Sequence, residues 1–256
     1  MLEGMTLDGS VALVTGGSRG IGRAVARELA GRGATVVVHY ATNADAANET
    51  LASLPGHDHV ALAADVSDPA QVAGLVGATM ERFGRVDVLV NSAGVYERQP
   101  VLETSYEEWQ AVWRRTIDTN LMGPANLMHA VAPHMVERGG GRIVNISSRG
   151  AFRGEPTHPA YGASKAGLNS LSQSLAKALA PHGVIVTAVA PGYVDTDMAA
   201  PYLNGPQGDA IRADYPLGRV STPEEIARLV AFLATPGTES LTGAVIDVNG
   251  ASYLRT

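Results

Sequence analysis

The sequence predicts an α/β fold in a single domain, built from a parallel sheet with helices on both faces. Three observations support this prediction. Short apolar runs that suit strands alternate with helical segments, as in βαβ units. The strand candidates are apolar nearly throughout, which is expected where both faces of a sheet are covered. No internal repeat or linker divides the 256 residues, and α/β folds of this length commonly stay undivided.

The first half of the chain begins with a βαβ unit. Residues 11–15 form the first strand candidate and pass directly into a glycine-rich turn and a helix, which is expected to end at Gly31 and Gly33. The next apolar run completes the unit. The elements expected from there on are a strand at 35–38, a helix at about 45–54, a strand at 60–63, a helix at 69–83 and a strand at 86–90.

The middle of the chain holds a long helical region at about 106–138, where Gly123 and Pro124 offer a place for a kink or a break. A strand at 142–147 follows. A twelve-residue loop then leads to a helix that is expected to open at Tyr161 and to run to residue 181.

The last part of the chain contains the segment 191–217, which is polar and shows no sustained period. Because loops of this length are usually functional, we interpret it as a substrate lid. Thr222 as N-cap, with Pro223 and Glu225 after it, predicts the start of a helix. The remaining expected elements are strands at 184–190 and 245–248.

The composition argues against several classes of function. A net charge of −6 speaks against nucleic acid as the main partner, because phosphate contacts need a basic face. No run of 18 apolar residues is present, so we expect neither a membrane span nor a membrane partner. The chain has no cysteine, and residues 1–5 lack the pattern of a signal peptide, which together fit a cytoplasmic protein. His57 and His59 lie in an expected turn without a third ligand, so we expect no metal site.

The turn after the first strand has the spacing of a phosphate-binding loop. Gly16, Gly20 and Gly22 let the backbone approach a pyrophosphate, while the following helix offers free N–H groups and a partial positive charge. An ordinary turn without a ligand is the alternative, and the position inside a βαβ unit makes it the weaker one. NADP(H) is favoured over NAD(H) because residues 39–41 hold no carboxylate for the adenosine ribose and Arg19 is available for a 2′-phosphate. The nearby Asp45 is the main argument for NAD(H).

Tyr161 and Lys165 are four residues apart on a helix, so their side chains lie on one face. Leucines 168, 171, 175 and 179 continue that face and are expected to bury it. A phenol titrates near ~10, and we expect the ammonium beside it to lower this pKa toward a useful range for proton transfer.

Taken together, the motifs resemble those of the short-chain dehydrogenase/reductase family, over essentially the whole chain and most closely in its 3-oxoacyl-carrier-protein reductases. They are, in order, Gly16 to Gly22, Asn91-Ser92-Ala93-Gly94, Asn120, Ser148, Tyr161-x-x-x-Lys165 and Pro191-Gly192. Ser92 is a mild departure from the usual asparagine. The resemblance implies a doubly wound Rossmann fold of about seven parallel strands, a nicotinamide cofactor and a homotetramer.

The resemblance also implies roles for individual residues. Tyr161 would be the general acid/base, Ser148 would orient the substrate carbonyl, Lys165 would bind the nicotinamide ribose, and Asn120 would hold a water that connects the site to solvent. Asp65 would lie beside the adenine, or instead cap the next helix. The residues expected to contact the cofactor are Gly16, Ser18, Arg19, Gly20, Ile21, Gly22, Asp65, Val66, Asn91, Ala93, Gly94, Tyr161, Lys165, Pro191, Gly192, Val194 and Thr196.

The function implied is NADPH-dependent reduction of a ketone to a secondary alcohol, with a 3-oxoacyl thioester as one candidate substrate. An alcohol, sugar or steroid dehydrogenase of the same family, or a silent NADPH-binding regulator, are the alternatives. Residues 149–160 and 191–217 are expected to select the substrate, and the two arginines of the first segment suggest an anionic or polar one. For a carrier protein, Arg138 is a candidate contact, whereas His182 stands where a second arginine is common.

Overall fold

The computed structural model describes residues 6–255. Residues 1–5, for which no signal peptide is expected, lie outside the described part. Seven parallel strands form one sheet in the order β3-β2-β1-β4-β5-β6-β7, which confirms the predicted fold class. The strands are β1 (Val11–Val14), β2 (Thr35–Tyr40), β3 (Val60–Ala63), β4 (Val88–Asn91), β5 (Gly141–Ile146), β6 (Val184–Pro191) and β7 (Val245–Val248).

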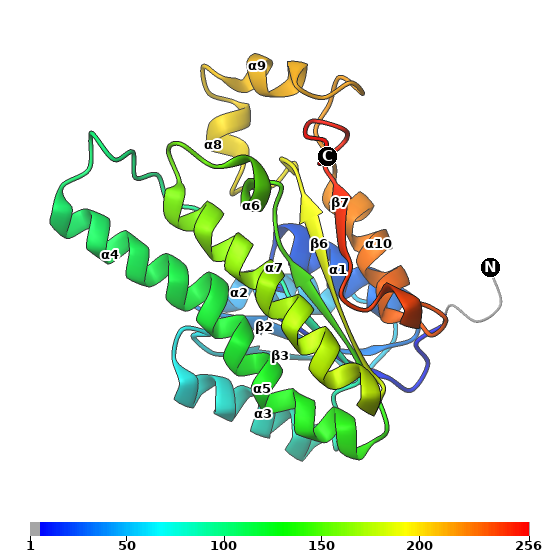
Figure 1. Ribbon diagram of the computed structural model, residues 1–256. Coiled ribbons are helices and arrows are strands. Elements are labelled where there is room, and N and C mark those ends of the chain that lie inside the picture. Colours follow the sequence, from blue (N-terminus) through cyan, green and yellow to red (C-terminus); the bar gives the residue numbers. More distant parts are fainter. Residues whose placement is uncertain (1–5, 256) are drawn as a thin grey trace.

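Helices cover both faces of this sheet (Figure 1). On one face α1 packs against α10, and on the other α3, α5 and α7 lie side by side. The helix α4 runs in line with α5 and packs against α7. The helices are α1 (Gly20–Gly31), α2 (Ala44–Ala52), α3 (Pro69–Phe83), α4 (Tyr106–Ile117), α5 (Gly123–Glu137), α6 (Gly150–Arg153), α7 (Pro159–Leu179), α8 (Ala200–Leu203), α9 (Gly208–Ala213) and α10 (Pro223–Ala234).

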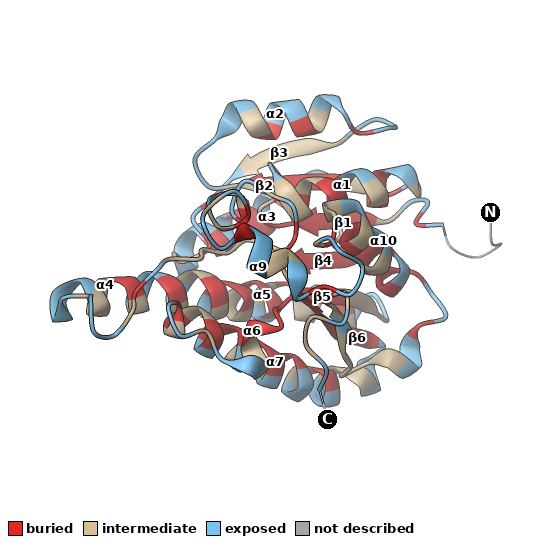
Figure 2. Ribbon diagram, turned by 90° about the horizontal axis from the view of Figure 1, so that it is seen from above, coloured by how far each residue is buried: buried red, intermediate tan, exposed pale blue. Residues whose placement is uncertain are grey.

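The two-sided core explains why the strands are apolar throughout. In β1, Ala12 and Val14 face α1 and α10, while Val11 and Leu13 face the opposite layer. Successive side chains of a strand point to opposite faces, so a strand covered on both sides needs an apolar residue at every position. Figure 2 shows the buried residues concentrated in the central strands and in the sides of the helices that face them.

The chain order places a crevice beside β1. The chain runs from β1 outward to β2 and β3, then returns to the other side of β1 to form β4. Ligands of doubly wound folds bind outside the carboxyl ends of the strands where the order reverses. The glycine turn after β1 and the loops after β4, β5 and β6 therefore meet at one edge of the sheet.

Several boundaries differ from the sequence prediction. The helical region 106–138 is divided by a π-helical segment, Asp118–Met122, just ahead of the predicted break. The helix of Tyr161 opens two residues earlier, at Pro159, and one helical turn, α6, interrupts the loop before it. The segment 191–217 is not wholly irregular, because it contains α8 and α9. The predicted capping box at Thr222 and Glu225 is present.

Membrane-spanning helices and metal sites can be searched for in the described residues alone. Within residues 6–255, no helix combines the length and apolar character that a membrane crossing needs. The same residues contain no cluster of three potential metal ligands. His59 is engaged in the turn before β3, where its Nδ1 accepts a hydrogen bond from Val36 N–H at 3.0 Å and its Nε2 lies 2.9 Å from Pro55 O.

Candidate active site

The glycine turn is compact because its glycines lie where no side chain fits. A Cβ on Gly16 would lie 2.9 Å from Ala93 Cα, and one on Gly22 would collide with the carbonyl oxygen of Gly16. Gly16 and Gly20 also have φ angles of +63° and +53°, the left-handed region that favours glycine. These constraints bring the start of α1 against the turn and the β4 loop.

His39 supports this turn from below. It is buried at the end of β2, where its Nδ1 accepts a hydrogen bond from Gly16 N–H at 3.1 Å, and its Nε2 lies 2.9 Å from Ala64 O. Since Nδ1 is the acceptor, Nε2 carries the proton. Burial lowers the pKa of His39, so the ring is neutral at neutral pH. The side chain at the position where NAD-specific sites place a carboxylate therefore points into the protein.

The start of α1 is suited to an anion. Its N-cap, Arg19, provides no side-chain cap, and the first helical bond is donated by Arg23, so the N–H groups before it precede the helical ladder. Arg19 is exposed and lines a surface cavity together with Asn43 and Asp45. Close backbone approach, an uncapped helix start and a flanking guanidinium fit the pyrophosphate and 2′-phosphate of NADP(H).

Ser148, Tyr161 and Lys165 come together at the carboxyl end of β5. Ser148 follows this strand, and its Oγ accepts a hydrogen bond from Gly150 N–H at 3.0 Å, which fixes the hydroxyl at the start of α6. Tyr161 stands on the first turn of α7 and lines the same cavity as Ser148. Lys165 lies one turn further, with Nζ 5.7 Å from the centre of the Tyr161 ring. The predicted inward face of this helix is present.

The pKa values of the pair depart from the sequence expectation. Burial raises the pKa of Tyr161 to about 12, although a hydrogen bond with Ser148 acts in the opposite direction. Burial also lowers the pKa of Lys165 to about 8. In this structure the ammonium does not bring the pKa of the phenol below its ordinary value, so the expectation is wrong. The reason is that Lys165 Nζ donates to Ile146 O at 2.7 Å, while desolvation is the largest influence on the pKa of each group.

Asn120 occupies the π-helical segment between α4 and α5. Its amide is fully buried and clamps the loop after β4, because Oδ1 accepts from Val95 N–H at 2.8 Å and Nδ2 donates to Val95 O at 3.0 Å. Nδ2 also donates to Ser164 Oγ at 3.3 Å. Both amide hydrogens are thus used by protein, so a water could bind this amide only by donating a hydrogen bond to Oδ1. The wider turn of a π-helix directs this residue inward next to Gly94.

The other motif residues of the loops after β3 and β4 have structural partners. Asn91 donates from Nδ2 to Asn145 Oδ1 at 2.8 Å, and Asn145 donates to Ser172 Oγ at 2.8 Å, a buried chain that joins β4, β5 and α7. Asp65 accepts from Ser67 N–H and Oγ at 2.9 and 2.7 Å. The alternative role of Asp65 as helix cap is wrong, because Asp68 caps α3.

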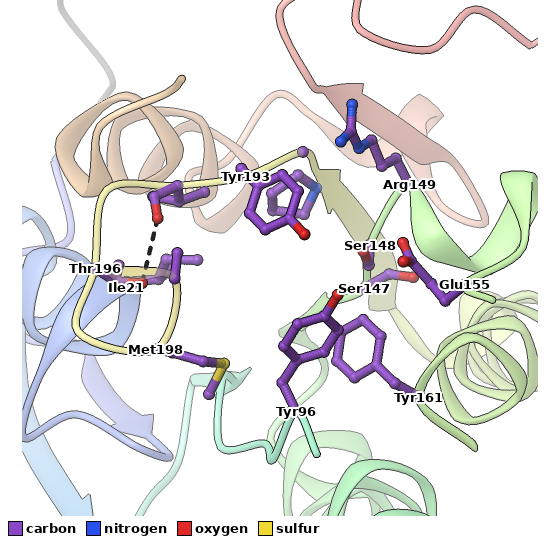
Figure 3. Close-up of a pocket in the computed structure, with 14 residues that line it drawn as sticks. Ile21, Tyr96, Ser147, Ser148, Arg149, Glu155, Tyr161, Tyr193, Thr196 and Met198 are labelled. Atoms are coloured by element: carbon purple, nitrogen blue, oxygen red, sulfur yellow. Dashed lines mark hydrogen bonds between the residues drawn. The ribbon is translucent and has the colours of Figure 1, made fainter. Parts of the chain in front are cut away.

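One cavity brings together the predicted residues of the catalytic and nicotinamide regions (Figure 3). Those that line it are Ile21, Ser148, Tyr161, Pro191, Gly192, Val194 and Thr196, whereas Lys165 and Asn120 lie behind the wall. Tyr96, Tyr193 and Met198, which the sequence did not single out, also line it, although the last two lie in the segment 191–217 that was expected to select the substrate. Two of them follow motifs directly, since Tyr96 comes two residues after Gly94 and Tyr193 comes after Gly192. That adjacency is the signal that would have found them.

The segment 191–217 is fastened over this cavity at two points. Near its end, Tyr215 is buried beneath its start, where the hydroxyl accepts a hydrogen bond from Tyr193 N–H and leaves no room for a Cβ on Gly192. In its middle, the hydroxyl of Tyr202 on α8 lies 2.7 Å from Nε2 of His158, the residue that precedes α7. Burial, reinforced by Arg98, lowers the pKa of His158 to about 4, so this imidazole is neutral.

Comparison with known proteins agrees with this geometry. A family model described as enoyl-(acyl carrier protein) reductase matches residues 16–251. A 3-oxoacyl-[acyl-carrier-protein] reductase of Synechocystis is 41% identical over 251 residues, covering 97% of this chain and 98% of the relative. The chain belongs to the short-chain dehydrogenase/reductase family. This confirms the predicted family and, because the relatives are oxidoreductases, the predicted class of enzyme.

Solved structures of the family have the same fold. A dehydrogenase/reductase from Sinorhizobium meliloti superimposes with a TM-score of 0.89 at 35% identity, covering 98% of both chains. A short-chain dehydrogenase from Burkholderia cenocepacia, solved in complex with NADP, gives a TM-score of 0.88 at 35% identity and covers 96% of this chain and 98% of the other.

Proposed function

We propose that this short-chain dehydrogenase/reductase catalyses the NADPH-dependent reduction of a ketone to a secondary alcohol. The observation that carries the proposal is that Ser148 and Tyr161 line one cavity with Lys165 beneath them, at the sheet edge that holds the glycine turn. The NADP-bound relative and the uncapped start of α1 beside Arg19 support NADP(H) as the cofactor.

The chain's own residues account for the proton side of this reaction. The nicotinamide, when bound, supplies the hydride. Ser148 Oγ hydrogen-bonds the carbonyl oxygen and holds it beside the Tyr161 hydroxyl. With a pKa of about 12, Tyr161 is protonated at neutral pH and donates its proton to that oxygen. Lys165, with a pKa of about 8, is mainly an ammonium at pH 7 and binds the nicotinamide ribose. Asn120 Oδ1 holds the water through which Tyr161 regains a proton.

The remaining predicted cofactor contacts are part of the same proposal. The turn residues from Gly16 to Gly22, which include Ser18, Arg19 and Ile21, hold the phosphates. Asp65 and Val66 flank the adenine, and the strip from Asn91 to Gly94 supports the central part of the cofactor. Thr196, whose methyl would meet a Cβ on Gly20 at 3.2 Å, lies over the glycine turn and reaches the carboxamide. The segment 191–217 closes over the substrate.

The relatives' name makes 3-oxoacyl thioesters the first substrates to test. The position of Arg138 limits how a carrier protein would dock. Arg138 and His182 lie where β5 and β6 begin, and six residues of β5 span about 20 Å to the end that carries Ser148. Within one chain these residues are therefore remote from the site, so a carrier protein that used Arg138 would have to bind across a second subunit.

The experiment measures NADPH oxidation with the acetoacetyl thioester of N-acetylcysteamine. The wild type should consume NADPH, and Tyr161→Phe should abolish turnover while NADPH binding, followed by its fluorescence, stays close to wild type. Tyr106→Phe is the matched control, because Tyr106 is 78% exposed at the start of α4. Turnover by Tyr161→Phe at the wild-type rate would contradict the assignment of the acid.

We further propose that the chain forms a homotetramer in the cytoplasm. The family resemblance and the exposed apolar residues Val101 and Leu102 beside α4 support an assembly, and the absence of cysteine fits a reducing compartment. Light scattering on the purified protein measures the assembly, and a monomer would exclude it.

A further inference from the structure

Arg149, the residue directly after Ser148, is a buried cation. The residue is 2% exposed, and among the described lysines and arginines the other buried one is Lys165, at 5%. Removing an ion from water costs several kcal/mol unless an opposite charge and hydrogen bonds compensate for it. The partners of Arg149 therefore decide what this residue does.

Within the described part of the chain, no carboxylate forms an ion pair with Arg149. None of the ion pairs within residues 6–255 includes it. Glu155, the acidic residue among those that line the first cavity, is paired with Arg153 at 3.6 Å, and Asp214 lines the second cavity without an ion pair to Arg149. A guanidinium has five N–H donors, and the hydrogen bond found for this one runs from Nη1 to Ser252 O at 3.5 Å. Nε and Nη2 have no partner among the described residues.

Two tyrosines hold the guanidinium in place without neutralising it. Its Cζ lies 5.4 Å from the ring centre of Tyr193 and 5.3 Å from that of Tyr215. Such cation–π contacts orient the plane and leave the edge with its N–H groups free. In Figure 3, the side chain of Arg149 lies beside Tyr193 and on the same side of the cavity as Ser148.

Arg149 lies in the wall between two neighbouring cavities. The first is the cavity of Ser148 and Tyr161, and the second extends beneath α9. Four residues line both of them, namely Tyr96, Arg149, Glu155 and Tyr193. Ser148 and Arg149 both line the first cavity, so a substrate in that cavity can contact both side chains. The second cavity is also lined by Arg153, which pairs with Glu155, and by Arg98 and Asp214, whose charges cancel. The charge of Arg149 is therefore the one that is left over.

We propose that Arg149 binds the carboxylate of a short oxo acid whose ketone is held by Ser148 and Tyr161. The substrate class is then a free oxo acid rather than a neutral thioester. A planar guanidinium fork binds a carboxylate through two parallel hydrogen bonds, and an ion so enclosed supplies the missing counter-charge. This inference rests on the proposed ketone reduction and adds the substrate class to it.

The test compares acids with their neutral analogues. NADPH-dependent reduction of acetoacetate and 4-oxopentanoate is measured beside that of their methyl esters and of the acetoacetyl N-acetylcysteamine thioester. Wild-type kcat/KM should be higher for each acid than for its ester. Arg149→Met should lower this acid-to-ester ratio by about 30-fold or more, mainly through KM. That factor corresponds to about 2 kcal/mol, the lower end of the cost of removing one partner of a buried charge pair.

Two further variants separate charge recognition from packing. Arg149→Lys keeps the charge without the fork and should retain part of the preference for acids. Arg82→Met makes the same change in net charge at an exposed position in the last turn of α3 and should leave the ratio at its wild-type value. If Arg149→Met fails to fold, the wild-type ratio and that of Arg149→Lys still decide.

The outcomes distinguish this inference from the proposed function. If the wild type reduces the ester or the thioester as well as the acid, or if Arg149→Met lowers both equally, Arg149 only packs against the two tyrosines. The inference is then overturned while ketone reduction stands. If the wild type reduces none of these ketones, the proposed function fails, and the inference fails with it.

Discussion

The hydrogen bond between Tyr202 and His158 should control how firmly the segment 191–217 closes. Tyr202 lies on α8 within that segment, and its hydroxyl is 2.7 Å from Nε2 of His158, which precedes the helix of Tyr161. The imidazole also stacks on Tyr96 with ring centres 3.8 Å apart. Tyr202→Phe removes the hydroxyl and keeps the ring that packs edge-on against Tyr96. The substitution therefore isolates one hydrogen bond.

The size of the effect follows from the charge state of the bond. Because the pKa of His158 is about 4, both partners are neutral near pH 7. A neutral, partly buried hydrogen bond contributes about 0.5–1.5 kcal/mol, which corresponds to a two- to tenfold change in the opening equilibrium. We expect KM for the ketone to rise by this factor, because the segment covers the substrate cavity.

Hydrogen–deuterium exchange measures the opening directly. Amides of residues 196–214 in Tyr202→Phe should exchange two to ten times faster, while those of β1 and β4 keep wild-type rates. Tyr253→Phe, which alters another tyrosine that is not fully exposed, serves as the control for loss of a hydroxyl elsewhere. Unchanged exchange in residues 196–214 would refute the idea that this bond fastens the segment. Faster exchange across the whole chain would show a general loss of stability instead.

Three further predictions follow from the site. Arg19→Ala should raise KM for NADPH about tenfold and KM for NADH much less, because the substitution removes a charged hydrogen bond to the 2′-phosphate. Steady-state kinetics with both cofactors measure this difference, and an equal loss for NADPH and NADH would contradict the role of Arg19. Ketone reduction should decline as pH rises through about 8, where Lys165 loses its proton and the acid, with its pKa of about 12, keeps its own. A pH profile of kcat/KM that stays flat to pH 10 would argue against this role. Gly192→Ala should lower the free energy of unfolding by about 1–3 kcal/mol in urea, because its Cβ meets the hydroxyl of Tyr215, whereas Gly74→Ala in open space on α3 should not.

The fold was predictable because its signals are local. Each central strand must be apolar at every position, and Thr222 with Glu225 marks a helix start by chemistry that a few neighbouring residues contain. The order of Gly16, Ser148, Tyr161 and Lys165 likewise identifies the sheet edge that carries the site, because each follows or faces a strand end. These features do not depend on distant parts of the chain.

The features that the sequence did not predict depend on distant contacts. The π-helical segment at Asn120 is stabilised by the backbone of Val95, 25 residues earlier. The helix α9 has six residues, too few to form without the packing around it. The burial of Arg149 is created by Tyr193 and Tyr215, which follow it at 44 and 66 positions in the sequence. None of these three features produces a local pattern in the sequence.

The preferred direction of the reaction can be argued only when the sequence and the burial of its residues are considered together. The sequence places a phenol and an ammonium one helical turn apart, and this arrangement alone is equally compatible with reduction and oxidation. Burial separates the two. With a pKa of about 12, Tyr161 holds its proton at neutral pH, which suits donation to a carbonyl oxygen, whereas oxidation of an alcohol needs the phenolate. The rate of alcohol oxidation is therefore expected to rise with pH, as the fraction of phenolate grows. Over the same range Lys165 loses its charge, near pH 8. We therefore expect the initial rate of reduction at pH 7 to exceed that of oxidation.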